Sequence, residues 1–236
     1  MMMRFFARAG RAGKAGKAGP RNQPHQPHQP YQPSSVSCSV IALLAIGAAS
    51  ILSAQNNASD TAKLIEVLQL KPGHVVAEIG AGGGDLTVAI AKHVGPSGRV
   101  FTSELGAERI TKLRDAVTKS GADNVQVVEG QEAHANLPDG CCDAVFMRNV
   151  YHHFSDPTTM NASFLRALKP GGRVAVIDFM PRNNAAIAPP GKRGEDSAHG
   201  VSADVVANEL KTAGFQIVST EDRGERWFLV VGSKPN

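Results

Sequence analysis

The clearest structural signal in this 236-residue chain is the sequence VVAEIGAGGGDL at residues 75–86. An apolar run typical of a buried strand leads into a glycine-rich turn, and a helical pattern follows. Glycine permits a tight backbone turn and lets a ligand lie directly against the main chain, where a Cβ atom would collide with it. The stretch therefore predicts a strand, a turn and a helix that together bind a ligand beyond the end of the strand.

Outward from this stretch, short β-rich runs alternate with helical stretches, which is typical of a parallel sheet flanked by helices. Only residues 221–225 join the last two expected strands, too few for a crossover helix, so these strands form an antiparallel hairpin. The predicted fold class is α/β: a Rossmann-like seven-stranded mixed sheet with the last strand antiparallel and helices on both faces. The expected strands are 74–79, 99–104, 124–129, 143–148, 172–179, 215–220 and 226–231, and the expected helices are 59–70, 86–94, 107–120, 158–168 and 202–213.

The acidic residues around the turn indicate which ligand binds. Glu104 ends the second expected strand, twenty residues after Gly84, where a carboxylate can accept both hydroxyls of an adenosine ribose. A dinucleotide fingerprint would place its third glycine at position 85, but that residue is Asp85, whose charge opposes a pyrophosphate at a helix N-terminus. Glu78 adds negative charge that suits a sulfonium and an ammonium group. The predicted cofactor is S-adenosyl-L-methionine; the alternative is that the glycines only close a turn and Glu104 caps the next helix.

Four segments resemble the successive motifs of class I S-adenosylmethionine-dependent methyltransferases: VVAEIGAGGGDLT, FTSE, CCDAVFMRNVYHHF and LKPGGRVAVIDF. The resemblance covers about residues 60–232 and implies the same seven-stranded fold with a reversed last strand. It also implies that the acid and glycines of the turn line the methionine end of the cofactor, that the acid after the second strand binds the ribose, and that the next residue packs on the adenine. These residues are Glu78, Gly80, Gly82 and Gly84, then Glu104, and then Leu105.

The segment after the third expected strand departs from the family pattern. The family often has Gly-Asp-Ala there, with the Asp facing the adenine amine, whereas this chain has Gly130, Gln131 and Glu132. We therefore expect Gln131 or Glu132 to substitute for the missing acid. Of the segment after the fourth strand, Asn149 is the residue expected nearest to the cofactor.

Two adjacent histidines, His152 and His153, follow the fourth expected strand and are predicted catalytic residues. Ligands lie beyond the carboxyl ends of the strands in open α/β sheets, and imidazole titrates near neutral pH, so either ring can orient an acceptor or take its proton. A base is needed only if the acceptor must lose a proton, because methyl transfer from a sulfonium is an in-line displacement. The alternative is structural: one ring packs under the loop and the other caps the helix near Asp156.

An insertion at residues 180–200 follows the fifth strand on the same edge of the sheet. It is too long for an ordinary connection, so we expect a lid over the site. Its charged residues can recognise an acidic or polar acceptor, and the alternative is a solvated surface loop. His199 is the third predicted catalytic residue, and no metal site is expected. The other residues considered for acceptor recognition are Arg182, Lys192 and Arg193.

The predicted function is transfer of a methyl group to a small-molecule acceptor. The segment RNVYHHF lacks the Asn/Asp-Pro-Pro-aromatic motif of nucleic-acid amine methyltransferases, and no nucleic-acid partner is expected. NVYHHF and LKPGGRVAVIDF look more like the small-molecule branch of the family, which includes quinone C-methyltransferases. Two alternatives stay open: an NAD(P)-dependent oxidoreductase on the same topology, and a non-catalytic protein that binds an adenosine cofactor.

Residues 1–39 are expected to form a disordered, basic tail rich in His, Gln and Pro, because they offer too few apolar side chains to offset chain entropy. Residues 1–59 hold six Lys and Arg and no Asp or Glu, whereas the rest of the chain has 19 basic and 21 acidic residues. The basic charge therefore belongs to the tail and not to the expected methyltransferase domain at residues 58–236.

Residues 40–54 form a hydrophobic segment, of which residues 40–52 are thirteen positions without a charge. This run is shorter than the ~20 residues of a spanning helix and matches the apolar part of an export signal, with small residues near a cleavage point. We favour export or membrane anchoring, with membrane association through residues 40–52, over a cytoplasmic location. The alternatives are an organelle transit segment and a leader added by a misplaced start.

Three cysteines, Cys38 and the adjacent Cys141 and Cys142, are too few for a disulfide framework. The adjacent pair begins the fourth expected strand, at the edge of the sheet away from the cofactor, so we expect buried or inert cysteines there. The core must then be held together by packing.

Overall fold

The computed structural model describes residues 56–182, 186–195 and 198–236. The predicted tail (1–39) and hydrophobic segment (40–54) lie outside these residues. No helix within the described ranges is both long enough and apolar enough to cross a membrane.

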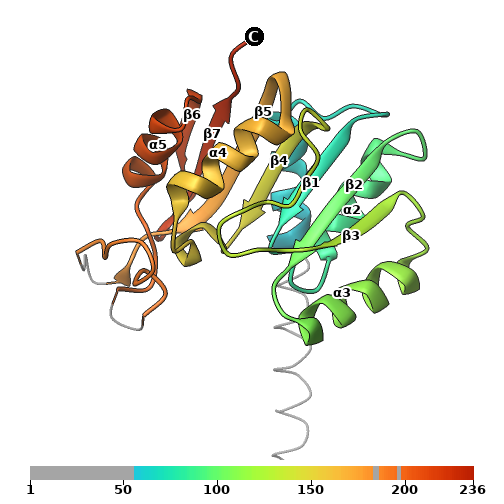
Figure 1. Cartoon of the computed structure of the whole chain (residues 1–236), viewed down its shortest axis with the longest axis horizontal. Coiled ribbons are helices and arrows are strands. Elements are labelled where there is room, and N and C mark those ends of the chain that lie inside the picture. The colour runs from blue at the N-terminus through green and yellow to red at the C-terminus, as the bar shows by residue number, and fades with distance from the viewer. Residues whose placement is uncertain (1–55, 183–185, 196–197) are drawn as a thin grey trace, which may run out of the picture. The chain divides into compact units, whose positions relative to one another are not determined.

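A seven-stranded sheet organises the described residues, with the strand order β3-β2-β1-β4-β5-β7-β6 (Figure 1). Strands β1 to β5 pair in parallel, and β7 pairs antiparallel with both β5 and β6. The predicted fold class, including the reversed last strand, is confirmed. The strands are β1 (Val75–Ile79), β2 (Arg99–Glu104), β3 (Val125–Glu129), β4 (Cys142–Arg148), β5 (Leu168–Phe179), β6 (Gln216–Asp222) and β7 (Trp227–Ser233).

Helices cover both faces of this sheet. Two of them begin at side-chain caps: the Asp156 carboxylate accepts the N–H of Thr159, and the Ser202 hydroxyl accepts the N–H of Val205. Each cap satisfies a backbone donor that the first turn of a helix leaves open, which fixes where the helix begins. Residues 56–67 are helical, and the other elements are α2 (Asp85–Val94), α3 (Ala107–Ser120), the 3-10 turn η1 (Tyr151–His153), α4 (Pro157–Ala167) and α5 (Ala203–Thr212).

The core consists of two apolar layers, one on each face of the sheet. Val76 packs in the layer that contains α2 and the 56–67 helix, whereas the next residue, Ala77, packs in the layer that contains α4 and α5. Figure 1 shows α4 and α5 in front of the strands. Because successive side chains of a strand point to opposite faces, the central strands must be apolar on both sides. Because the central strands are buried on both faces, the loops at their carboxyl ends are held in fixed positions.

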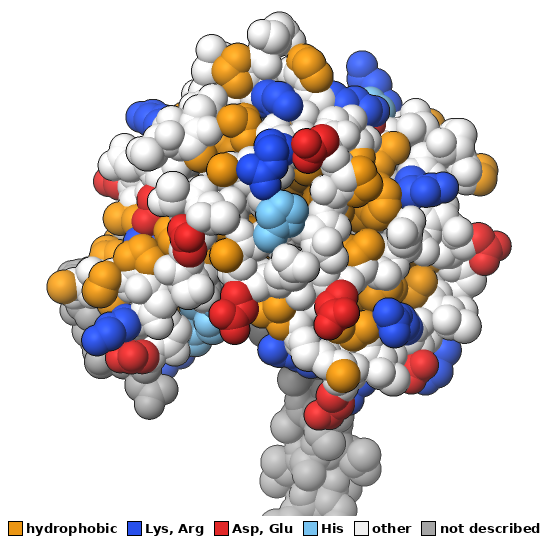
Figure 2. Space-filling model, viewed as in Figure 1, with side chains coloured by type: hydrophobic (Ala, Val, Ile, Leu, Met, Phe, Trp, Pro, Cys, Tyr) orange, Lys and Arg blue, Asp and Glu red, His pale blue; other side chains and the backbone are white. Residues whose placement is uncertain are grey.

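Charged side chains of both signs are interspersed over the face of the molecule seen in Figure 2. Lys and Arg side chains alternate there with Asp and Glu side chains, so neither sign forms a continuous stripe on that face. The mixed pattern agrees with the near balance of acidic and basic residues after position 59.

The LKPGG segment differs from its prediction. The sequence suggested a helix that ends at Leu168 and a strand that starts at Gly172, but α4 ends at Ala167 and β5 begins at Leu168. Leu168 pairs with Cys142, and the register then shifts before Ala144. Proline and glycine are tolerated at such an irregularity, because it leaves a backbone N–H out of the ladder. The turn residues therefore mark an irregularity inside β5 and not the start of the strand.

The adjacent cysteines also differ from a simple pair of thiols. The Sγ atoms of Cys141 and Cys142 are bonded to each other. The sequence analysis did not predict this bond. Cys142 is fully buried at the amino end of β4, so the disulfide lies at the edge of the sheet away from the predicted cofactor residues.

Candidate functional site

A cavity of about 660 Å³ lies at the carboxyl ends of β1 to β4, within the size range of cofactor sites. This is the edge at which open α/β sheets bind their ligands. Of the predicted catalytic residues, His153 lines the cavity, whereas His152 and His199 do not. Among the predicted cofactor residues, Gly84 does not line it, and those that do are Glu78, Gly80, Gly82, Glu104, Leu105, Gln131, Glu132 and Asn149.

The glycines of the turn are required by the backbone. Gly80, Gly82 and Gly84 have φ angles of 70°, 56° and 81°, which other residues rarely adopt. A Cβ atom on Gly80 would collide with the side chain of Val150, in the loop after β4. A Cβ atom on Gly82 would meet no protein atom within 4 Å, so the space beside this cavity residue is open. Gly84 has another role, because it is the N-cap of α2 and packs close to Leu113.

Glu78 contributes a buried carboxyl group to the cavity wall, with 3% of the residue exposed. Burial raises its pKa to about 7, against the opposing effects of a hydrogen bond from the Thr87 hydroxyl and of the charge on Arg148. The Thr87 hydroxyl oxygen also lies 2.9 Å from that of Thr102. The carboxyl group is thus held in place by buried hydroxyls, and a cation that enters the cavity would favour its ionised form.

The Glu104 carboxylate connects the glycine-rich turn to the end of β2. Its Oε1 accepts the N–H of Gly82 at 2.8 Å, and its Oε2 accepts the N–H of Leu105 at 2.9 Å. The Nε atom of Arg109 lies 3.6 Å from the same Oε2. Leu105 is 38% exposed where it lines the cavity. A carboxylate and an exposed apolar side chain therefore stand next to each other, as the ribose and the base of a nucleoside require.

The remaining predicted cofactor residues come from two loops. Gln131 and Glu132 are exposed in the loop after β3, and this loop is fixed by the N–H of Gly130, which donates to the carbonyl of Glu104 at 2.9 Å. Asn149 follows β4 with a φ angle of 60°. Asparagine tolerates this left-handed conformation better than most residues, which accounts for its presence at this turn.

The helix before β1 supplies residues that the sequence analysis missed. The Asn57 side chain donates to Asp85 Oδ2 at 2.9 Å and accepts from Arg148 Nη1 at 2.7 Å. Asp60 accepts from the same Arg148 nitrogen at 2.9 Å and from Arg223 at 2.6 Å. Because Asp85 and Arg148 line the cavity, this helix braces its edge. No local pattern could have marked Asn57 or Asp60, since their partners lie 28 to 163 positions further along the chain.

The three predicted catalytic histidines lie together. His152 is 1% exposed, and its Nδ1 lies 2.8 Å from Asp178 Oδ1. Its Nε2 lies 3.0 Å from Nε2 of His199. His153 stands beside them in the cavity wall, and partial burial lowers its pKa, as do the neighbouring His152 and His199. The histidine rings thus extend from the buried Asp178 to the cavity, and the surroundings of His153 favour the neutral form of its ring.

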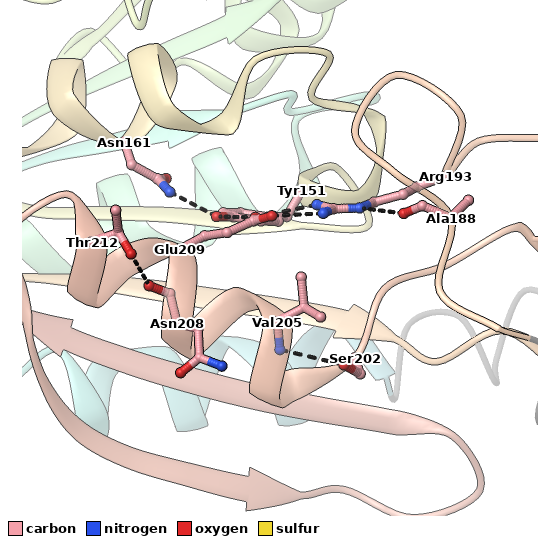
Figure 3. Close-up of polar contacts among 9 residues, drawn as sticks. All are labelled: Tyr151, Asn161, Ala188, Arg193, Ser202, Val205, Asn208, Glu209 and Thr212. Carbon is pink, nitrogen blue, oxygen red and sulfur yellow. Dashed lines mark hydrogen bonds and ion pairs between the residues drawn. The ribbon is translucent and has the colours of Figure 1, made fainter.

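The insertion is fastened to α5 by a buried ion pair (Figure 3). The guanidinium of Arg193, a residue that is 3% exposed, donates to Glu209 Oε1 at 2.6 Å and to Oε2 at 3.2 Å. The Tyr151 hydroxyl donates to Glu209 at 3.0 Å and accepts from Asn161 at 2.7 Å, and burial raises the pKa of this hydroxyl. Arg193 was considered for acceptor recognition, but its ion pair turns it into an anchor of the insertion. The insertion reaches the cavity at Gly191.

These features define the class of the domain. A seven-stranded sheet with a reversed last strand carries a glycine-rich turn after β1 and an acid at the end of β2, and both face one cavity. This is the arrangement of an α/β domain that binds an adenosine cofactor.

Comparisons with known proteins identify the domain further. Residues 77–176 match the family model described as a methyltransferase domain. The crystal structure of an S-adenosylmethionine-dependent methyltransferase from Aquifex aeolicus superimposes with a TM-score of 0.64 at 27% identity, covering 74% of this chain and 89% of that chain. The chain contains a class I S-adenosylmethionine-dependent methyltransferase domain, as predicted.

Curated relatives share part of the chain. The ubiquinone/menaquinone biosynthesis C-methyltransferase UbiE of Saccharophagus degradans is 32% identical over 124 residues, 52% of this chain and 50% of that protein. An arsenite methyltransferase of Halobacterium salinarum is 32% identical over 111 residues, 47% of this chain and 28% of that protein. The chain thus spans half the length or less of these relatives. The matches support a methyltransferase and not the oxidoreductase or the non-catalytic binding protein.

Proposed function

We propose that this chain transfers a methyl group from S-adenosylmethionine to a small-molecule acceptor. One observation carries the proposal: the buried Glu78 carboxyl group, the open position at Gly82 and the Glu104 carboxylate all line one cavity of about 660 Å³. A single elongated ligand with an ammonium group at one end and a ribose further along can therefore meet all three.

The cofactor is assigned to these residues by charge and shape. Glu78 binds the ammonium group, because a cation favours the ionised form of an acid whose pKa is about 7 in the free protein. Glu104 accepts the two ribose hydroxyls in place of the backbone N–H groups that it now accepts. Leu105 packs on the adenine, with Gln131 or Glu132 at the edge of the ring.

The acceptor is assigned to the part of the cavity beside His153. An in-line displacement gains most from aligning the acceptor with the methyl group and excluding water. The neutral imidazole of His153 can hold an acceptor hydroxyl or take its proton. His152 and His199 act behind it, as residues that position the His153 ring and the loop on which it stands.

The class of acceptor is supported by the names of relatives. One curated relative is named for ubiquinone and menaquinone biosynthesis, and another is named for arsenite. Both names point to small molecules and not to a polymer. The insertion and His199 lie outside the matched residues 77–176, whereas His152 and His153 lie within them, and we assign the choice of acceptor to the insertion together with these histidines.

Calorimetric titration of the full chain tests the proposal. We expect S-adenosylhomocysteine to bind in the micromolar range, NAD and NADP not to bind, and S-adenosylmethionine to be converted to S-adenosylhomocysteine when an acceptor is added. Binding of NAD or NADP without binding of S-adenosylhomocysteine would contradict it.

We further propose that the chain is exported or anchored to a membrane through residues 40–54. The support is the uncharged run at residues 40–52 together with the basic residues that precede it. Cell fractionation and N-terminal sequencing of the mature chain test this. A mature chain that starts after residue 54 or stays with the membrane agrees with the proposal, and a full-length chain in the cytoplasmic fraction contradicts it.

A further inference from the structure

Three imidazole rings from two distant segments come together beside the cavity. His152 and His153 belong to η1, and His199 ends the insertion just before α5. One ring nitrogen from each of the three histidines lies within 4.8 Å of those from the other two. The ring centroids of His152 and His199 are 4.8 Å apart, and those of His153 and His199 are 5.9 Å apart.

The buried member of this cluster has a defined orientation. Asp178 is fully buried and accepts the backbone N–H of His152 at 3.1 Å and that of Phe179 at 2.8 Å. Its carboxylate can only accept, so the His152 Nδ1, 2.8 Å away, carries the proton. The His152 Nε2 then presents a lone pair toward His199. A carboxylate behind a histidine is the arrangement that orients imidazole ligands of metal ions and raises their basicity.

We propose that His152, His153 and His199 bind one divalent transition-metal ion of the zinc class. Zinc binds imidazole nitrogen at ~2.0–2.1 Å, which in a tetrahedral site puts ligand nitrogens roughly 3.3 Å apart. The His152 and His199 nitrogens, 3.0 Å apart, already approach this separation. His153 and His199 are exposed, so a metal ion can reach both rings from solution.

The chemistry of the cluster selects the metal. Imidazole suits Zn²⁺, Cu²⁺, Ni²⁺ and Fe²⁺, whereas Mg²⁺ and Ca²⁺ prefer oxygen ligands. Three protein ligands leave a fourth position, as in zinc sites that bind a water or a substrate. His153 lines the cavity, so that position opens toward the acceptor space, and in the metal-bound chain the ion meets the acceptor in place of the free His153 ring. The ion would also connect the end of the insertion to the loop after β4.

Titration of the metal-free full chain with Zn²⁺ and with Co²⁺ tests the proposal. We expect one ion per chain, a rise in the melting temperature with added Zn²⁺, and a visible spectrum of four-coordinate Co²⁺. The variant His199→Ala should bind Zn²⁺ at least about 100-fold more weakly, since it removes one of three protein ligands. His199 lies outside the cavity lining, so this variant should still bind S-adenosylhomocysteine, which separates a failure of the metal site from a failure of the proposed function.

Two control variants address three other histidines of the chain. The double variant His25→Ala/His28→Ala removes the histidines of the tail, and His93→Ala removes a histidine of α2 whose Nε2 lies 3.1 Å from the carbonyl of Leu70. Both controls should keep the one-to-one binding of Zn²⁺. The proposal is overturned if the full chain binds no Zn²⁺, if His199→Ala binds it like the wild type, or if the tail variant loses the binding.

Discussion

The cofactor side of the cavity and its acceptor side differ in the kind of segment that carries their residues. On the cofactor side, the Glu104 carboxylate at the end of β2 accepts the backbone N–H groups of Gly82 and Leu105. On the acceptor side, His152 contacts Asp178 and His199, which lie 26 and 47 positions away, through side chains. The cofactor side is therefore set by the fold itself, whereas the acceptor side depends on a loop and an insertion that can change without changing the fold.

On the cofactor side, we expect the largest loss of cofactor affinity from the substitution Gly82→Val. We expect at least a roughly 100-fold loss of affinity for S-adenosylhomocysteine, equivalent to about 2.7 kcal/mol, because the branched side chain fills space that is open in the cavity. Gly140→Val is the matched control, since Gly140 has a φ angle of 61°, equally open space beside it, and no part in the cavity. Both variants should lose similar stability, and only the first should lose binding. Equal affinities in calorimetry would refute the placement of the pocket.

On the acceptor side, His153→Ala should lower turnover and leave the affinity for the cofactor product unchanged. Turnover should fall by roughly 100-fold, the usual range for loss of a group that orients an acceptor or takes its proton. Affinity for S-adenosylhomocysteine should stay unchanged, because the ring touches the acceptor space only. Steady-state kinetics and calorimetry on the same preparation check both parts. A variant that is less stable but keeps its turnover would make His153 a structural residue.

The contribution of the ribose contact is expected to be smaller. Glu104→Ala should weaken S-adenosylhomocysteine binding by roughly 1–3 kcal/mol, the range for hydrogen bonds to a charged group and for polar groups left unsatisfied. Glu108→Ala, at an exposed acid that pairs with Lys112 on α3, is the control and should change nothing. If calorimetry gives both variants the affinity of the wild type, another residue holds the ribose.

The smallest expected effect is a pH dependence due to Glu78. Its pKa of about 7 means that the free protein must lose a proton to bind an ammonium group. The affinity for S-adenosylhomocysteine should therefore rise about tenfold between pH 6 and pH 8, and Glu78→Gln should bind weakly with no such rise. Calorimetry in buffers of different ionisation enthalpy should detect one proton released by the wild type at pH 6. A flat profile for the wild type would mean that Glu78 does not meet the ammonium group.

The raised pKa of Glu78 has the opposite effect on the stability of the free protein: stability falls with rising pH, whereas cofactor affinity rises. Between pH 4.5, the ordinary value for Glu, and about 7, the unfolded chain has lost a proton that the folded protein keeps on Glu78. The contribution of Glu78 to the free energy of unfolding should therefore fall as the pH rises from 4.5 to about 7. Urea titrations of Glu78→Gln should lack this component.

The cofactor side was predictable because its signals are local. A strand, three glycines and an acid at a fixed spacing report a backbone that must turn tightly, and the positive φ angles at Gly80, Gly82 and Gly84 are the reason for them. The fold was predictable for the same kind of reason, since residues 221–225 are too few to do anything but reverse the chain. The LKPGG segment was assigned wrongly because proline and glycine occur both at irregularities within a strand and at strand ends.

The acceptor side was less predictable because its signals are spread along the chain. The sequence pointed to His152, His153 and His199 one by one, and only the fold shows that the three rings lie together, with His152 against Asp178. Arg193 was misjudged because its partner, Glu209, lies on α5 and nothing near it in sequence announces an ion pair. Side-chain contacts between distant segments produce no periodic pattern in the amino-acid sequence.

A crystal structure of the full chain with S-adenosylhomocysteine would show directly whether the cofactor binds to Glu78, Glu104 and Leu105. We expect the amino group within about 3.2 Å of the Glu78 carboxylate, the ribose hydroxyls on Glu104 and the adenine against Leu105. A nucleoside bound elsewhere, or a Glu104 that keeps both backbone N–H groups of Gly82 and Leu105 and touches no ribose, would contradict it.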